Sequence, residues 1–303
     1  MRILVPGQAA SIARTDSRGK AARRELVCAV LLAIPATVFH EQIRNLWTTA
    51  LQDDRYSHVL LIPVISAILL FSGRRSIFST APAYSLAGLP LMTLGLALRW
   101  PVGFIRDGND ALACGMLGLA LAWVGAFLFC FGRKAARAAT FPLGFLILMI
   151  PLPTALLNAA VNALQHSSAA VTGAVFAILR IPARWEALSF TLNGYGYEIA
   201  VECSGIRSCM GLLVVSIVAG YLLLRSMWAR VVFALLTIAA AIFKNAVRIV
   251  TVSWLTSYVD KSYYTSWIHT SGGVLFSLAA LAILIPSLLG LQRMERSHSR
   301  QIR

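Results

Sequence analysis

The feature that most constrains this chain is a series of apolar runs, several of them close to the ~20 residues that cross the hydrocarbon core of a bilayer. With 58% hydrophobic residues and a mean hydropathy of +0.74, the 303-residue chain has too few polar side chains to cover a soluble fold. A backbone inside a bilayer must satisfy its own hydrogen bonds, and a helix does so within one segment. The sequence therefore predicts an all-α integral membrane protein.

We expect about eight transmembrane helices. Clusters of lysine and arginine flank the apolar runs, and such clusters face the cytoplasm under the positive-inside rule. These clusters account for the net charge of +15, so we expect no nucleic-acid partner. The expected spans are 26–46, 57–73, 84–104, 110–131, 137–152, 204–224, 229–257 and 268–291.

The same charge pattern divides the chain into three parts. Residues 1–25 are predicted to form a basic cytoplasmic tail, and residues 292–303 a second one. Residues 26–291 are expected to form a single transmembrane domain that carries every candidate catalytic residue. The protein is thus placed in the cytoplasmic (inner) membrane with both termini inside. The five cysteines follow no disulfide or metal spacing, and we expect no cofactor and no metal.

The segment between the fifth and sixth spans must begin and end on the outer side of the membrane, because crossings counted from either basic tail leave it there. Residues 155–180 predict a helix with one polar stripe, made of Asn158, Asn162, Gln165 and Thr172. A helix with one polar stripe favours an interfacial or re-entrant amphipathic position. A ninth membrane crossing remains the alternative.

The stretch LSFTLNGYGYEIAV, residues 188–201, follows this helix. Asn-Gly between two alternating apolar segments is a strong signal for a two-residue hairpin turn, here at Asn193 and Gly194. The sequence thus predicts a small extracytoplasmic β-hairpin that delivers the chain to Cys203. The expected fold class is all-α integral membrane, with eight or so spans, the amphipathic helix and this hairpin.

Cys203 stands in VECSGIRSC, where the hairpin gives way to an apolar run. We expect Ser204 and Gly205 to form the first turn of a helix whose N-terminus favours a thiolate. Arg207, four residues after the cysteine, would act in the same direction, whereas the carboxylate of Glu202 would oppose it. A nucleophilic thiol is one interpretation, and a cysteine packed at a helix cap is the other.

Arg248 lies in the apolar run 229–257, in the stretch FKNAVRIV. A charge at such a position costs at least ~2.5 kcal/mol on insertion scales, so it should have a partner or a water-filled cavity. Asn245 lies one turn earlier on the same helix face. A catalytic guanidinium and a structural ion pair, with Glu202 or Asp107, both remain open.

His269 opens the last expected span at its outer end. Cys203, Arg248 and His269 would then meet near the outer leaflet from three consecutive spans. A thiol, a guanidinium and an imidazole are the groups needed for acyl transfer, namely nucleophile, oxyanion stabiliser and proton shuttle. His58, also at an outer helix end, is the alternative candidate for the base. A residue at the membrane interface without a catalytic role is the other interpretation of His269.

Three blocks in this order, ECSGIRS, KNAVRIV and His269 with its trailing glycines, give the chain a resemblance to a known family. The chain resembles the exosortases and archaeosortases, which are membrane-embedded cysteine transpeptidases. The resemblance maps the family's cysteine, arginine and histidine to Cys203, Arg248 and His269. It implies, without a cofactor, cleavage of a C-terminal sorting signal of the PEP-CTERM kind on the outer face. The implied partners are membrane-anchored substrate proteins that carry this signal, with a lipid or a glycan as candidate acceptor.

Three other functions are compatible with the sequence. A polytopic transporter of a small anionic or lipid-linked solute would use Arg248 and Arg99 as binding charges. An intramembrane protease that hydrolyses its substrate would need the same acyl-enzyme as a transpeptidase. A scaffold of an export assembly would need no chemistry at all.

Overall fold

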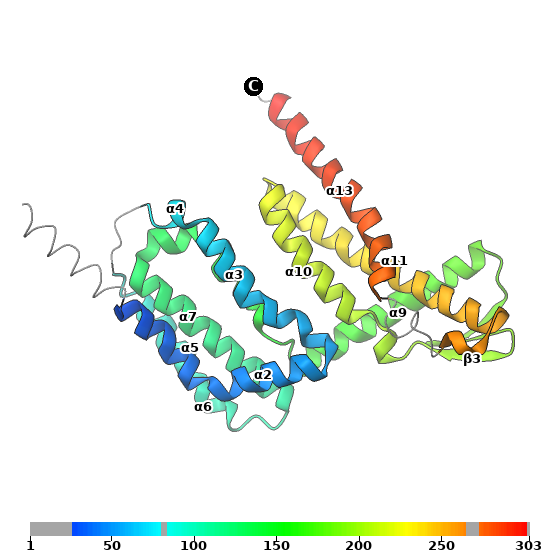
Figure 1. The fold of residues 1–303 in the computed structure, drawn as a ribbon, viewed down its shortest axis with the longest axis horizontal. Coiled ribbons are helices and arrows are strands. Elements are labelled where there is room, and N and C mark those ends of the chain that lie inside the picture. Colours follow the sequence, from blue (N-terminus) through cyan, green and yellow to red (C-terminus); the bar gives the residue numbers. More distant parts are fainter. Residues whose placement is uncertain (1–25, 80–83, 265–272, 302–303) are drawn as a thin grey trace, which may run out of the picture. The chain divides into compact units, whose positions relative to one another are not determined.

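A computed structural model describes residues 26–79, 84–264 and 273–301, and these are mostly helical (Figure 1). The chain divides into two compact units, with the boundary between Thr154 and Ala155. The secondary-structure elements of the described part of the first unit are all helices, and the second unit combines helices with a small sheet.

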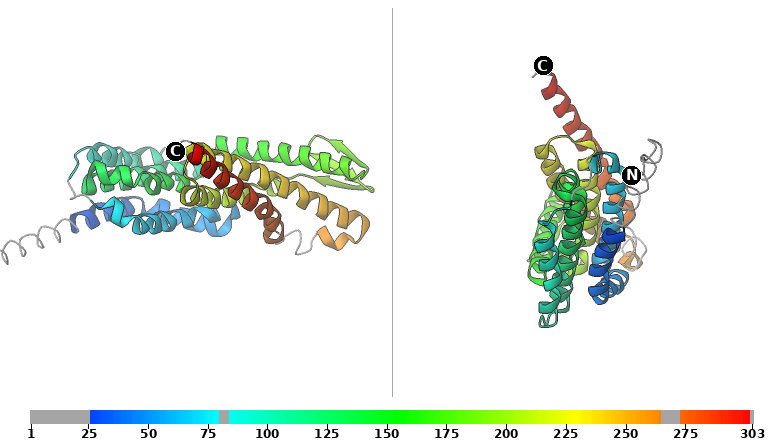
Figure 2. Two further views of the ribbon diagram at one scale, coloured as in Figure 1. Left: turned by 90° about the horizontal axis from the view of Figure 1, so that it is seen from above. Right: turned by 90° about the vertical axis from the view of Figure 1, so that its left-hand side faces the viewer.

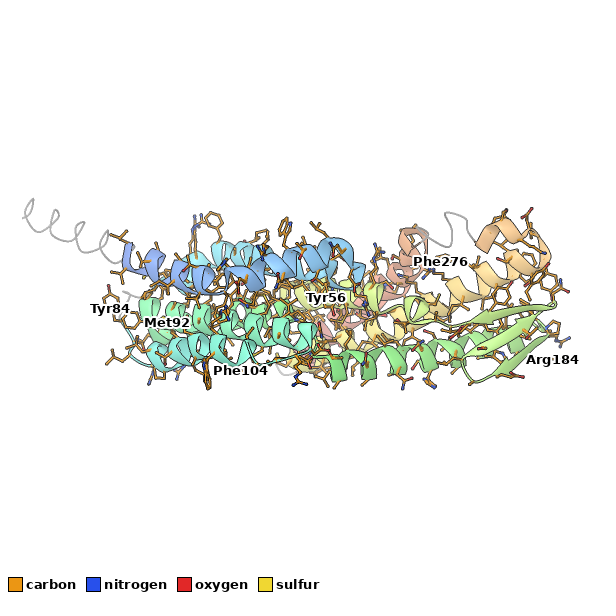
Figure 3. The ribbon with its side chains drawn as sticks, turned by 90° about the horizontal axis from the view of Figure 1, so that it is seen from below. Tyr56, Tyr84, Met92, Phe104, Arg184 and Phe276 are labelled. Carbon is orange, nitrogen blue, oxygen red and sulfur yellow. The ribbon has the colours of Figure 1, made fainter. Side chains whose placement is uncertain are left out.

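The first unit is held together by close helix packing. Glycines line the contact between the two helices at its centre, Gly88–Ala97 and Gly108–Ala138. A Cβ atom at Gly95 would lie 2.5 Å from the backbone nitrogen of Ala122, and one at Gly125 would lie 2.4 Å from that of Met92, which Figure 3 labels. Small residues let membrane helices approach this closely. The elements are helix Leu26–Val38, α2 (His40–Gln52), a 3-10 helix (Asp54–Leu60), α3 (Leu61–Ser72), α4 (Arg74–Ile77), α5 (Gly88–Ala97), α6 (Arg99–Val102), α7 (Gly108–Ala138), α8 (Thr140–Phe145) and a 3-10 helix (Leu146–Met149).

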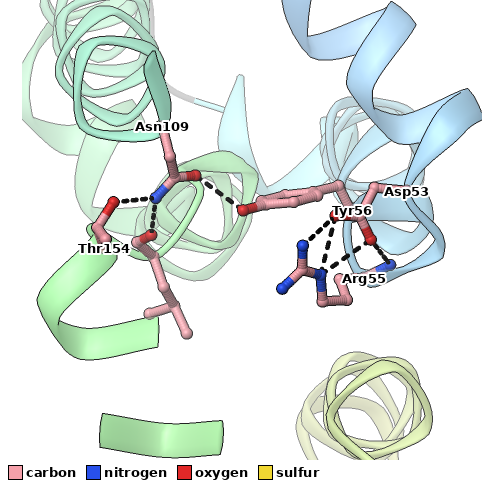
Figure 4. A network of polar contacts seen from close by, with 6 residues as sticks. Asp53, Arg55, Tyr56, Asn109 and Thr154 are labelled. Carbon is pink, nitrogen blue, oxygen red and sulfur yellow. Dashed lines mark hydrogen bonds and ion pairs between the residues drawn. The ribbon is translucent and has the colours of Figure 1, made fainter. Parts of the chain in front are cut away.

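A polar network fixes one end of this unit (Figure 4). The hydroxyl of Tyr56 donates to Oδ1 of Asn109 at 2.8 Å, and Nδ2 of Asn109 donates to the carbonyl of Leu152 at 2.8 Å. The carboxylate of Asp53 accepts a hydrogen bond from Nη2 of Arg55 at 2.6 Å. Hydrogen bonds from Arg55 hold the pKa of the Asp53 carboxyl below its usual range. The segment that carries His58 is thereby tied to the start of α7.

The second unit contains the sheet and three long helices. The apolar side chains of Leu224, Phe233 and Leu284 form one core between α10, α11 and α13. The elements are α9 (Thr154–Ile178), β1 (Ala183–Glu186), β2 (Ser189–Leu192), β3 (Tyr195–Glu198), a 3-10 turn (Val201–Cys203), α10 (Ile206–Leu223), α11 (Met227–Tyr258), a 3-10 turn (Lys261–Tyr264) and α13 (Gly273–Gln301).

The predicted hairpin is confirmed as β2 and β3, which pair antiparallel. Asn193 and Gly194 have φ values of 49° and 81°, as a turn with two left-handed residues requires. The sequence did not reveal β1, which extends the sheet to three strands in the order β1-β2-β3. Arg184 lies on this strand with its side chain exposed (Figure 3).

Five helices among the described residues are long and apolar enough to cross a membrane, or up to seven if each of two bent pairs is one span. The expected number of eight is therefore not confirmed. The expected span 84–104 is instead α5, with 10 residues, followed by α6, with 4. Pro101 lacks the N–H that would bond to the carbonyl of Ala97, so a continuous helix is interrupted there. The expected span 26–46 is bent by 66° where Leu26–Val38 meets α2.

The amphipathic helix is α9, which lies beside α11 with the sheet at one end of the pair (Figure 2). Asn158 and Asn162 are exposed, as expected. The prediction of a solvent-exposed polar stripe is wrong at Gln165 and Thr172, which are 9% and 0% exposed. Nε2 of Gln165 donates to the carbonyl of Ile199 at 2.8 Å, so this part of the stripe binds the chain that leads to Cys203.

Candidate active site

Cys203 is the last residue of the 3-10 turn Val201–Cys203, and α10 begins three residues later, at Ile206. Gly205 stands between them with φ at 78°, a left-handed conformation that breaks the helix on its N-terminal side. The expectation that Cys203 opens a helix is therefore wrong by one turn. Arg207 is exposed on α10, and its predicted i, i+4 relation to the thiol does not apply, because Cys203 is not on that helix.

Asn245 holds the thiol-bearing turn in place. Its side chain is 2% exposed, and Nδ2 donates to the carbonyl of Cys203 at 2.7 Å and to Oγ of Ser168 at 3.0 Å. A Cβ atom at Gly205 would lie only 2.9 Å from Cγ of Asn245, so the turn approaches α11 as closely as a glycine allows. One carboxamide thereby joins α9, the Cys203 turn and α11.

Cys203 and Arg248 line one pocket of about 50 Å³. Both residues are half-buried. Phe190 and Ile199 contribute the wall on the side of the sheet, and Val252, one turn after Arg248, continues the wall on α11. Cys203 itself packs against the apolar cluster that contains Phe190 and Ile199. The arrangement places a sulfur and a fixed positive charge around one small, mainly apolar space.

The remaining candidate residues have different positions. Ser204 is 1% exposed, and its hydroxyl accepts the backbone N–H of Ile206 at 3.4 Å, so it closes the turn. His58 belongs to the first unit, on the 3-10 helix Asp54–Leu60, where it is half-buried. His269 and the side chain of Glu202 lie outside the described residues.

The family comparison agrees with the motifs. The sequence model of the transmembrane exosortases (Exosortase_EpsH) matches residues 47–286. The chain belongs to the transmembrane exosortase family. No curated protein matches it, and no solved structure does. This exosortase-family protein is a multi-pass membrane protein, and the matched region includes Cys203, Arg248 and His269.

Sequence reasoning gave no role to Lys244, one turn before Arg248 on the same helix. The side chain of Lys244 is 2% exposed, and Nζ donates to Oγ of Ser277 on α13 at 3.1 Å. Arg248 and Arg207 are its charged neighbours, and the thiol of Cys209 lies close to it as well. The signal that singled out Arg248, a charge inside an apolar run, applied equally to this lysine.

The hydroxyl of Tyr197 is a second feature of this exosortase-family site. It contacts Oγ of Ser257 at 2.7 Å and donates to the carbonyl of Ser253 at 3.2 Å. The Tyr197 ring also stacks on Phe190, with 5.2 Å between the ring centroids. These contacts attach the sheet wall of the pocket to α11.

Proposed function

We propose that this exosortase-family protein is a membrane cysteine transpeptidase that cleaves a C-terminal sorting signal of exported proteins. The observation that carries the proposal is the shared pocket of Cys203 and Arg248 in a chain whose family acts at the membrane. The proposed substrates are membrane-anchored proteins with such a signal, and a lipid or a glycan is the proposed class of acceptor.

In the proposed reaction the Cys203 thiolate attacks the carbonyl carbon of the scissile peptide bond. The guanidinium of Arg248 stabilises the negative charge that develops on the carbonyl oxygen. The C–N bond breaks, the leaving amine receives a proton from His269, and a thioester on Cys203 remains. The acceptor then attacks the thioester carbonyl and gives its proton to His269, the C–S bond breaks, and the Cys203 thiolate and the protonated imidazole are regenerated. Water in place of the acceptor would turn the same sequence of steps into hydrolysis.

The basic clusters support an orientation with both termini in the cytoplasm and Cys203 on the outer side. A substrate with one transmembrane helix diffuses within the bilayer and presents its juxtamembrane signal at a fixed depth. A shallow site near the outer leaflet fits such a substrate, because neither partner has to leave the membrane.

The test is a comparison of two cysteines six residues apart. Cys203→Ser removes the proposed nucleophile, whereas Cys209→Ser changes a thiol that is 6% exposed and lies outside the pocket wall. A tagged protein with a short motif, one span and a basic C-terminal tail is co-expressed with each variant and followed by immunoblot. We expect Cys203→Ser to abolish processing and Cys209→Ser to retain it. Unchanged processing with Cys203→Ser would overturn the proposal.

One of the two binding charges that a transporter would use, Arg99, is paired with a carboxylate. Nη2 of Arg99 donates to Oε2 of Glu41 at 2.9 Å, so this guanidinium already has an anionic partner. A transporter would also tolerate the loss of the Cys203 thiol but not the loss of Arg248, whereas a transpeptidase requires both.

A further inference from the structure

The space beside Cys203 has walls of a defined chemistry. Phe190 and Ile199 are each 2% exposed, and Val252 is 6% exposed. Glu198, which is exposed at the end of β3, and Ser253 also border the space. Apart from the thiol and the guanidinium, the side chains facing the space are therefore mainly apolar.

The volume of this space limits what can enter it. At about 50 Å³ it is much smaller than the ~150 Å³ cavity known to bind benzene. A space of this volume suits an aliphatic side chain of a few carbon atoms better than an aromatic ring. A charged side chain would have to give up its hydration against mainly apolar walls, and in the proposed reaction the guanidinium of Arg248 is engaged by the carbonyl oxygen of the scissile bond.

Contacts with neighbouring elements hold the walls of this space in place. The Phe190 ring lies between those of Trp185 and Tyr197, with centroid separations of 4.8 and 5.2 Å. The Tyr197 hydroxyl is bonded to α11, and Asn245 fixes the Cys203 turn. A bulkier group would have to break these contacts to enlarge the space.

We infer that this pocket is a specificity subsite for one small aliphatic side chain of the substrate. The inference rests on the proposed function: the occupant is the side chain of the residue whose carbonyl Cys203 attacks. Its Cα is bonded directly to that carbonyl carbon, so attack by a sulfur on the pocket wall brings this side chain to the pocket. Val252 is the wall residue whose size can be varied to test the subsite, because it lines the space one turn after Arg248 on α11.

The test uses alkyl methanethiosulfonates as probes of the full-length protein. Such a reagent transfers its alkylthio group to the Cys203 sulfur as a mixed disulfide, and methanesulfinate leaves. The methyl, isobutyl and benzyl reagents are compared by mass spectrometry of the Cys203 peptide, with Cys203→Ser to identify labelling of other cysteines. We expect the benzyl reagent to react about 10-fold more slowly than the methyl reagent with Cys203 of the wild-type protein.

Variants of Val252 provide the decisive comparison. Val252→Ala should raise the benzyl rate towards the methyl rate, and Val252→Leu should slow the isobutyl reagent while leaving the methyl reagent unaffected. Val252→Phe should block all but the methyl reagent, and an unchanged methyl rate shows that the fold is intact. Val231→Ala and Val231→Phe are the matched controls, because Val231 is 53% exposed on the same helix. These two should leave all three rates unchanged.

Labelling does not depend on catalysis, so two failures can be told apart. Equal rates for all three reagents, unaltered by Val252→Ala, would overturn the subsite even if Cys203→Ser abolishes processing. Processing that survives Cys203→Ser would overturn the proposed function even if labelling follows size. Processing of the tagged substrate by Val252→Leu at the unmodified rate would overturn the substrate assignment.

Discussion

The side-chain amide of Asn245 donates a hydrogen bond to the carbonyl oxygen of Cys203 at 2.7 Å. Asn245 precedes Arg248 by three residues, so both face the Cys203 turn from the same side of α11. The relation between the sulfur and the guanidinium is therefore set by one residue that contacts the backbone of the first and shares a helix face with the second.

Replacing Asn245 should impair both folding and chemistry. Asn245→Ala leaves the Cys203 carbonyl and the Ser168 hydroxyl without their partner in a buried place, at a cost of about 1–3 kcal/mol per group. We expect a lower melting temperature and slower alkylation of Cys203. Ser168→Ala is the matched control, because it removes the other hydrogen bond of the same carboxamide and should leave the alkylation rate unchanged. Equal effects of the two variants on alkylation would contradict a positioning role for Asn245.

Gly205→Ala should destabilise the protein by about 1–3 kcal/mol, because the residue combines a φ of 78° with a close contact to Asn245. Gly211→Ala on α10 is the opposite case: the space around this glycine is open, and alanine should stabilise the helix by about 0.5–1 kcal/mol. Thermal unfolding of both variants in the same detergent measures the difference. A neutral Gly205→Ala would show that the turn can adopt another conformation.

Lys244→Met should preserve the melting temperature or raise it. The lysine is 2% exposed, and a buried cation with a hydroxyl partner is expensive to desolvate, so an apolar side chain of similar length is often as stable or more stable. If Lys244→Met is strongly destabilising, the ammonium contributes to folding. Higher stability together with lost substrate processing would indicate that the charge is kept for function.

Asp53 should contribute a pH-dependent stabilisation to the first unit. Hydrogen bonds from Arg55 lower the pKa of this carboxyl in the folded state, so the contribution is complete above the unfolded pKa of about 3.9. It is lost as the pH falls through the lower, folded pKa. The Asp53→Asn variant should therefore show a flatter fall in melting temperature below about pH 4 than the wild-type protein. Identical pH profiles for the two proteins would exclude this linkage.

The sequence by itself predicted the features that depend on local pattern. Long apolar runs identified the membrane helices, and the Asn193-Gly194 pair identified the hairpin, because both signals lie within one segment. A charge inside an apolar run singled out Arg248 for the same reason. The motifs also identified the family. Local pattern reports which face of an element is apolar, but it does not report what covers that face.

Tertiary structure decided everything that depends on contacts between distant segments. The sequence placed Gln165 in a solvent-exposed polar stripe, yet its side chain is buried, because the carbonyl of Ile199, 34 residues away, accepts its hydrogen bond. β1 has too short a pattern to be recognised without its pairing to β2. The left-handed Gly205 moved Cys203 off its expected helix, and the close contact with Asn245 explains why only glycine fits. The pocket beside the sulfur exists because the sheet packs against α11, and the free energy of that packing is a property of both segments together.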